Sequence, residues 1–133
     1  MKKYDVVIVG GSAAGVTAAQ TVCRHHPGKR VLVLRREEQV MVPCGIPYIF
    51  GTLESLEKNL MPSTIQGTDV RIGEATAVDP VAKTVQTAEG QIGYERLVLA
   101  TGSSPMIPPI SGLEKTGVFD VRKDTAYLAG LQG

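Results

Sequence analysis

The stretch Val6-Val7-Ile8-Val9-Gly10-Gly11-Ser12-Ala13-Ala14-Gly15 decides the fold of this chain. Its first four residues form a short apolar run, rich in β-branched side chains, which is typical of a strand buried on both faces of a parallel sheet. The glycines break this run, and the alanine-rich segment 13–24 predicts a helix that His26-Pro27-Gly28 ends. Residues 30–34 predict a second buried strand. Over residues 4–34, this order of strand, glycine turn, helix and strand predicts a βαβ unit, and hence an α/β fold with a parallel sheet.

The glycines of this stretch stand where a dinucleotide-binding fingerprint stands, directly after a strand and before a helix. Gly10 permits the tight turn and Gly15 lets helix and strand pack closely, while the free N–H groups at the helix start favour a pyrophosphate. Ser12 replaces the middle glycine of the G-x-G-x-x-G pattern. The alternative is a glycine turn that joins strand and helix without a ligand.

The end of the second predicted strand departs from the dinucleotide-binding pattern. That pattern has an Asp or Glu there, about 20 residues past the glycines, to hold the ribose hydroxyls. This chain has Arg35-Arg36 instead, and its acids follow as Glu37-Glu38. An arginine here favours a 2′-phosphate, and hence NADP. The alternative is a solvated charge cluster on a loop.

The pattern changes after the second strand. Residues 43–48 (Pro-Cys-Gly-Ile-Pro-Tyr) predict a loop that opens a short helix, and residues 53–60 predict another helical turn. Between residues 70 and 94, short strand candidates separated by turn signals predict an antiparallel β insertion. Residues 97–100 predict a further buried strand, which leads into a Gly- and Pro-rich stretch, and residues 120–132 predict a helix.

Cys44, at the predicted start of the short helix, is the candidate for chemistry. The orphan N–H groups and the dipole of a helix N-terminus stabilise a thiolate, which attacks disulfides, persulfides or peroxides. The alternative is an inert cysteine in a loop. Cys23 lies near the end of the first predicted helix, where the dipole opposes a thiolate, so we expect it to serve in packing. Neither cysteine has a partner at metal-ligand spacing, and a zinc site is not expected.

Charge and hydropathy exclude several classes of function. The formal net charge of +1 gives no basic field for nucleic acid or for acidic membranes. No apolar run approaches the ~20 residues of a membrane helix, and the N-terminus lacks the features of a signal peptide. We therefore expect a cytoplasmic globular protein that has neither a nucleic-acid partner nor a membrane partner.

Three motifs occur in order, over residues 7–15, 43–48 and 94–105. Together they resemble the FAD-dependent pyridine nucleotide–disulfide oxidoreductases. The most similar branch is the single-cysteine one, with coenzyme A disulfide reductases, NADH oxidases, NADH peroxidases and polysulfide or persulfide reductases. The position five after Cys44 is Ile49, which argues against the branch of glutathione reductase and lipoamide dehydrogenase, because their internal disulfide needs a second cysteine. The resemblance implies a Rossmann-like FAD-binding domain.

The resemblance also implies a role for each motif. The glycine turn would hold the FAD pyrophosphate, the Ala-Thr-Gly segment would pass close to FAD, and Cys44 would be the redox cysteine beside the flavin. The cofactor-binding positions that it implies are Gly10, Gly11, Ser12, Ala13, Ala14, Gly15, Leu34, Arg35, Arg36, Pro43, Ala77, Ala100, Thr101 and Gly102. In the coenzyme A branch, polar residues along the first helix contact the substrate, and Thr17, Thr21 and Arg24 are the candidates here.

By the same resemblance, residues 1–133 are the N-terminal part of a longer, homodimeric enzyme whose NAD(P)H-binding and dimerisation domains lie outside this chain. Electrons would pass from NAD(P)H through FAD to Cys44, which would attack a small sulfur substrate, and the isolated chain is expected to be inactive. The alternative is a non-catalytic NAD(P)-binding sensor module, which Arg35-Arg36 and the short length favour. That alternative leaves the cysteine loop and the Ala-Thr-Gly segment unexplained, and a purely structural domain would leave the glycine turn unexplained.

Overall fold

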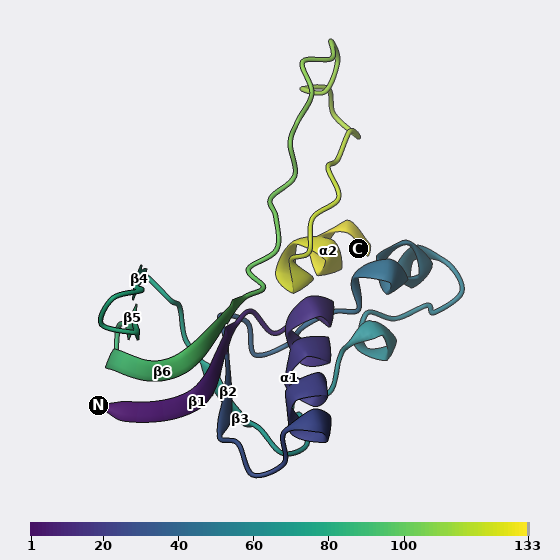
Figure 1. The fold of residues 1–133 in the computed structure, drawn as a ribbon. Helices are drawn as coiled ribbons and strands as arrows, with labels where there is room; N and C mark the ends of the chain where they lie inside the picture. Colours follow the sequence, from purple (N-terminus) through teal and green to yellow (C-terminus); the bar gives the residue numbers. More distant parts are fainter. Residues whose placement is uncertain (133) are drawn as a thin grey trace.

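A computed structural model describes residues 1–132 and contains one six-stranded sheet with a long helix packed on one of its faces (Figure 1). The strands lie in the order β3-β2-β1-β6-β5-β4. β1 pairs in parallel with both β2 and β6, and β2 pairs in parallel with β3, whereas β4–β5 and β5–β6 are antiparallel. The strands are β1 (Lys2–Val9), β2 (Val31–Arg35), β3 (Asp69–Ile72), β4 (Ala77–Asp79), β5 (Thr84–Thr87) and β6 (Gly90–Leu99).

Two α-helices and two 3-10 helices accompany the sheet. They are α1 (Ala13–His25), η1 (Pro43–Phe50), η2 (Glu57–Asn59) and α2 (Thr125–Gln132). α1 follows the glycine turn and covers one face of the parallel strands. Residues 101–124 leave the end of β6, extend away from the sheet and return to α2, which packs against η1 (Figure 1). The βαβ unit and the α/β fold with a parallel sheet are confirmed.

The core is divided by the alternation of side chains along the strands. Val6 and Ile8 of β1 face α1 and pack with Ala19, whereas Val7 and Val9 belong to the cluster on the opposite face. Both sets are buried, which explains why the strand is apolar throughout rather than alternating. Cys23 is half-buried against the α1 side of the core, and its Sγ lies 3.4 Å from the Gly67 carbonyl oxygen, so the predicted packing role is confirmed.

The predicted antiparallel insertion over residues 70–94 is wrong in extent. β3 pairs in parallel with β2, from Leu32↔Asp69 to Arg35↔Ile72, and therefore belongs to the parallel half of the sheet. β6 is one ten-residue strand that begins antiparallel to β5 and continues beside β1 as far as Val9↔Leu99. The segments 90–94 and 97–99 thus form a single strand, because β1 is long enough to pair with both.

Two of the predicted helices after β2, over residues 53–60 and 120–132, are shorter than expected. Only Glu57–Asn59 of the segment 53–60 forms a helical turn. The helix predicted from residue 120 begins at Thr125, because the Asp124 carboxylate accepts a hydrogen bond from the Tyr127 N–H at 2.9 Å and so caps the helix. A third apolar cluster, between η1 and α2, contains Met41, Ile46, Ile49, Leu56 and Leu128. Within residues 1–132, no helix combines the length and hydrophobicity needed to cross a bilayer.

Candidate functional site

The glycine turn draws three strand ends and the start of α1 together. The Gly10 N–H donates to the Leu34 carbonyl at 2.8 Å, and the Ala100 N–H donates to the Val9 carbonyl at 2.8 Å. Gly10 has φ +115°, and a Cβ at this position would overlap the Ala100 carbonyl. A Cβ at Gly15 would overlap the Gly10 carbonyl. Glycine is therefore required at both positions by close backbone approach.

A cleft of about 470 Å³ opens where β1, β2 and β6 end. The carboxyl ends of parallel strands are the place where α/β sheets bind ligands. The predicted cofactor residues that line this cleft are Gly10, Gly11, Ser12, Leu34, Arg35, Arg36, Ala100, Thr101 and Gly102. They come from three separate segments, which the sheet brings together.

Five predicted cofactor residues lie outside the lining of the cleft: Ala13, Ala14, Gly15, Pro43 and Ala77. The first three form the opening turn of α1, and their backbone belongs to the helix start that borders the cleft. Pro43 begins η1. Ala77 starts β4 and pairs with Gln86 in the antiparallel part of the sheet, so the structure does not bring it to the cleft.

Several residues that line the cleft are missing from the predicted set, among them one whole wall and the cation of Lys123. The turn after β3, Gly73–Ala75, supplies the lining where Ala77 was expected. This turn is held in place because the Gly73 N–H donates to the Arg35 carbonyl at 2.8 Å. Lys123 also lines the cleft, and its Nζ lies 3.8 Å from the position of a Cβ on Gly102. No local signal marks Lys123, because it enters only when the excursion 101–124 returns.

The start of α1 is suited to an anion. Ser12, the N-cap residue, makes no side-chain capping hydrogen bond with any described residue, and the first turn of α1 contains no acid. The first N–H groups of a helix have no partner inside the helix, and the helix dipole is positive at this end. Together with the Gly10–Ser12 backbone on the cleft wall, this end of α1 favours a pyrophosphate.

Arg35 is buried, with 3% of its surface exposed, and therefore does not belong to a solvated charge cluster. Its guanidinium donates to the backbone carbonyls of Glu38 (2.9 Å) and Ser63 (3.2 Å), so it ties the loop after β2 to the segment before β3. Its Nε is buried and has no hydrogen-bond partner within residues 1–132. A Cβ on Gly11 would lie 2.5 Å from the Arg35 Cδ, so the arginine stem forms the floor beneath the glycine turn.

Arg36 fits the interpretation of a solvated charge. Its guanidinium is exposed and makes ion pairs with Glu37 at 3.3 Å and with Glu74 at 3.7 Å. Exposed pairs of this kind contribute little to stability. They do place two carboxylates on the rim of the cleft, at the end where the ribose carboxylate of the dinucleotide-binding pattern was expected.

A second hollow, of about 750 Å³, continues from the cleft beneath the excursion and shares Arg36 and Lys123 with it. Asp120 and Arg122 form part of its lining. Arg122 donates to both carboxylate oxygens of Asp120 (2.7 and 2.9 Å) and lies over the Tyr127 ring. The Arg122 guanidinium holds the pKa of Asp120 below its usual value, and burial raises the pKa of Tyr127. This hollow lacks the glycine turn, so the smaller cleft remains the candidate nucleotide site.

Cys44 lies in the first turn of η1 and is exposed. Val40 and Met41, which lead into this turn, line the same cleft as the glycine turn. The predicted short helix is therefore confirmed, as a 3-10 helix, and its entry adjoins the candidate nucleotide site. Within residues 1–132, no group of three or more His, Cys, Asp and Glu side chains could hold a metal ion.

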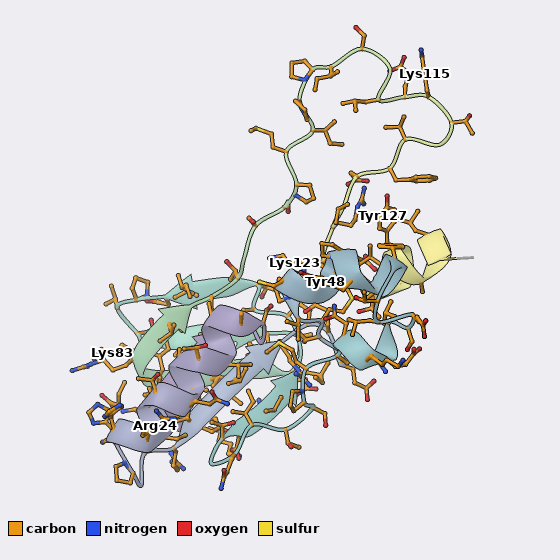
Figure 2. The ribbon with its side chains drawn as sticks, turned by 90° about the vertical axis from the view of Figure 1, so that its right-hand side faces the viewer. Arg24, Tyr48, Lys83, Lys115, Lys123 and Tyr127 are labelled. Carbon is orange, nitrogen blue, oxygen red and sulfur yellow. The ribbon has the colours of Figure 1, made fainter. Side chains whose placement is uncertain are left out.

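Thr17, Thr21 and Arg24 are all exposed on α1. Their spacing of four and three residues places them on one face of the helix, along about 10 Å of its axis. Figure 2 shows Arg24 at the C-terminal end of α1, whereas the labelled Tyr48 and Lys123 lie toward the other end of the helix. The three polar residues thus form an outer stripe, separate from the lining of the cleft.

Comparisons with known proteins agree with this architecture. Residues 4–130 match the family described as pyridine nucleotide-disulphide oxidoreductase. The NADH oxidase of Methanocaldococcus jannaschii is 33% identical over 129 residues, which cover 87% of this chain and 29% of the oxidase. The NAD(P)H coenzyme A polysulfide/persulfide reductase of Pyrococcus horikoshii is 39% identical over 126 residues, which cover 88% of this chain and 28% of the reductase.

A solved structure of an oxidase also has the fold of this chain. An engineered mutant of the water-forming NADH oxidase from Lactobacillus brevis superposes with a TM-score of 0.74 at 27% identity. The match covers 98% of this chain and 31% of the oxidase. The chain therefore spans less than a third of the length of the proteins that it resembles.

Proposed function

The chain belongs to the pyridine nucleotide-disulphide oxidoreductase family, and from this premise we propose that it forms the FAD-binding part of an enzyme that reduces a small sulfur substrate with NAD(P)H through Cys44. Flavoproteins of this family use FAD and NAD(P)H. One observation carries the proposal: Cys44 is exposed on a turn whose entry, Val40 and Met41, lines the cleft of the glycine turn.

The residues of the cleft fit FAD. A Cβ at Gly10 or Gly15 would occupy space that the backbone needs, and the uncapped start of α1 offers N–H groups to a pyrophosphate. The segments 34–36 and 73–75 would hold the adenosine end, and Ala100–Gly102 would border the rest of the cofactor. FAD, when bound, supplies the redox chemistry that protein side chains lack.

The chain itself contributes the nucleophile. The Cys44 thiolate would attack one sulfur of a disulfide RS–SR, form the mixed disulfide between Cys44 and one R group, and expel RS⁻, which takes up a proton. Two electrons that originate from NAD(P)H, with a second proton, would then release the other RSH and restore the Cys44 thiolate. The exposure of Cys44 supports this role, since an in-line attack needs access to the sulfur.

The substrate class that we propose is a coenzyme A disulfide, or a polysulfide or persulfide used together with coenzyme A. The polar stripe of Thr17, Thr21 and Arg24 supports a ligand longer than a bare sulfur chain, because it offers two hydroxyls and one cation along α1. A cation at Arg24 suits a phosphate group of the coenzyme. The reductase from Pyrococcus horikoshii, by its name, acts on polysulfides and persulfides with coenzyme A.

Flavin and nucleotide titrations test the cofactor assignment on the protein as its gene encodes it. We expect FAD to bind, with quenching of flavin fluorescence, and FMN to bind at least about tenfold more weakly, because FMN lacks the adenosine that the segments 34–36 and 73–75 would hold. Tight binding of NADP, with no binding of FAD, would replace the enzyme with the sensor alternative.

Substitution of the two cysteines tests the chemistry. We expect Cys44→Ser to abolish the NAD(P)H-dependent reduction of coenzyme A disulfide and to leave FAD binding unchanged. Cys23→Ser is the matched control, because it removes a thiol that serves in packing on α1, and it should retain activity. Full activity of Cys44→Ser would contradict the proposed role of Cys44 while leaving the FAD site intact.

A further inference from the structure

Asn59 holds the turn that carries Cys44. Its side-chain amide Nδ2 donates to the Val42 carbonyl at 3.1 Å, and the Val42 N–H donates to the Asn59 carbonyl at 2.9 Å. The Val42 carbonyl also accepts the Gly45 N–H at 3.0 Å, which closes the first turn of η1 around Cys44. One carbonyl oxygen thus receives both the hydrogen bond that forms the turn and the hydrogen bond from Asn59.

The packing at this point requires the amide. Asn59 is 4% exposed, and a Cβ on Gly45 would overlap its amide group, so the Asn59 side chain lies directly against the backbone of the residue after Cys44. The Met61 N–H donates to the Val40 carbonyl at 2.7 Å, so a second backbone hydrogen bond joins the segment before Cys44 to the segment after η2. Backbone bonds therefore fix where this turn begins, and the Asn59 side chain fixes how its first residues lie.

No apolar or acidic side chain of this size could do the same. Asn supplies the N–H₂ donor that the Val42 carbonyl accepts, whereas an aspartate of the same shape has no donor and would oppose that carbonyl with a negative charge. The Val42 carbonyl would keep only the Gly45 N–H as its donor, so the turn would lose the hydrogen bond that ties it to η2. Glu57 and Lys58, the charged neighbours of Asn59 on η2, are exposed and do not replace it.

We propose that Asn59 is a positioning residue for the sulfur chemistry of Cys44: its buried amide closes the turn Val42–Gly45 and so sets how the thiol is presented. This inference rests on the proposed function, because it assigns Asn59 a part in the reaction of Cys44. It predicts that the reactivity of the exposed thiol depends on a side chain 15 residues away, which does not itself react.

The rate of alkylation of Cys44 by iodoacetamide, read by mass spectrometry from the peptide that contains Cys44 and measured against pH on the protein as its gene encodes it, tests the proposal. A Cys23→Ser background removes the other thiol of residues 1–133. We expect Asn59→Asp, which keeps the shape of the side chain and loses the Nδ2 donor, to slow alkylation at pH 7 about tenfold, because the turn that presents the thiol loses its hydrogen bond to the Val42 carbonyl. Asn59→Ser, which is too short to reach the Val42 carbonyl, should fall between this variant and the parent.

The matched control is Gln86→Glu. Gln86 is another part-buried amide whose Nε2 donates to a backbone carbonyl, that of Thr87 at 2.9 Å, but it lies in β5, far from η1 in Figure 1. If Asn59→Asp acted only by lowering stability, both variants would lower the urea midpoint and neither would change the alkylation rate of Cys44. We therefore expect Gln86→Glu to lower the urea midpoint without altering the alkylation rate of Cys44.

An alkylation curve of Asn59→Asp or Asn59→Ser that coincides with the parent curve, in a variant that still unfolds cooperatively, would overturn the proposal. Where Asn59→Asp does not fold, the curve of Asn59→Ser decides the question. The two proposals can fail separately. If the Asn59 variants alkylate more slowly than the parent but Cys44→Ser keeps full activity, the proposed function fails and the role of Asn59 in the turn stands.

Discussion

Gly10 is the residue whose replacement the structure allows us to treat most quantitatively. It directly follows β1 and has φ +115°, and a Cβ there would overlap the Ala100 carbonyl, which lies just beyond β6. Gly10→Ala therefore combines two costs. The disallowed φ costs about 1–3 kcal/mol, and forcing the overlapped backbone apart costs about 1–3 kcal/mol more. We expect a loss of about 2–6 kcal/mol in the free energy of unfolding, out of the about 5–15 kcal/mol typical of a domain.

Gly90 provides a control that shares the backbone angle. Its φ is +114°, and among the described residues nothing lies within 4 Å of a Cβ built on it. Gly90→Ala should therefore show only the conformational cost, about 1–3 kcal/mol. The difference between the two variants isolates the contact with the Ala100 carbonyl, and we expect it to be about 1–3 kcal/mol.

Urea denaturation followed by far-ultraviolet circular dichroism measures both values, provided that the slopes of the two variants agree. Equal destabilisation by Gly10→Ala and Gly90→Ala would refute the reasoning, because it would mean that the strand ends are not as close as the structure places them. Gly10→Ala should also weaken FAD binding, since the displaced turn borders the proposed pyrophosphate site, whereas Gly90→Ala should not.

Three further predictions concern stability. The Tyr4 hydroxyl lowers the pKa of Asp69 through a 2.8 Å hydrogen bond, so this carboxylate contributes stability above about pH 4 that is lost as pH falls through its lowered folded-state pKa. Tyr4→Phe should therefore be less stable than the parent at pH 7. A difference in urea midpoint between the two proteins that does not narrow toward pH 2 would contradict this. Arg35→Met should lower the free energy of unfolding by about 1–3 kcal/mol, because two backbone carbonyls lose their donor. A variant more stable than the parent in urea would show that burial of the cation costs more free energy than its hydrogen bonds contribute. Leu128→Ala should lose about 2–5 kcal/mol, since Leu128 is fully buried between α2 and η1; unchanged thermal unfolding would mean that α2 does not dock there.

The local part of the fold could be predicted from the sequence. The continuous apolar run of β1, the glycine turn and the alanine-rich α1 each carry their own pattern within about ten residues, and strand, turn and helix follow from it. Cys44 was marked in the same way, by the prolines and glycine around it, and the structure places it in the first turn of a short helix as expected. These features depend on backbone preferences and on neighbouring residues alone.

Other parts of the site have no such local signal. Nothing in the sequence near Asn59 indicates that it closes the turn of Cys44, and nothing near Gly73 or Lys123 indicates a wall of the cleft. For Arg35 the sequence left open a contact with a 2′-phosphate or a solvated charge cluster, whereas the chain folds over this side chain and its guanidinium donates to carbonyls from two other segments. Each of these roles appears only when segments far apart along the chain are brought into contact.

There is a physical reason why the sequence predicts some of these features and not the others. Whether a segment becomes a strand or a helix depends on side-chain pattern and backbone freedom, which are properties of a few consecutive residues. Which strand lies beside β2, and whether residues 90–99 form one strand or two, depends on pairing across distant parts of the sheet. The glycine turn and Cys44 could therefore be found in the sequence, whereas the third wall of the cleft, the burial of Arg35 and the amide that holds the cysteine turn were decided by long-range packing.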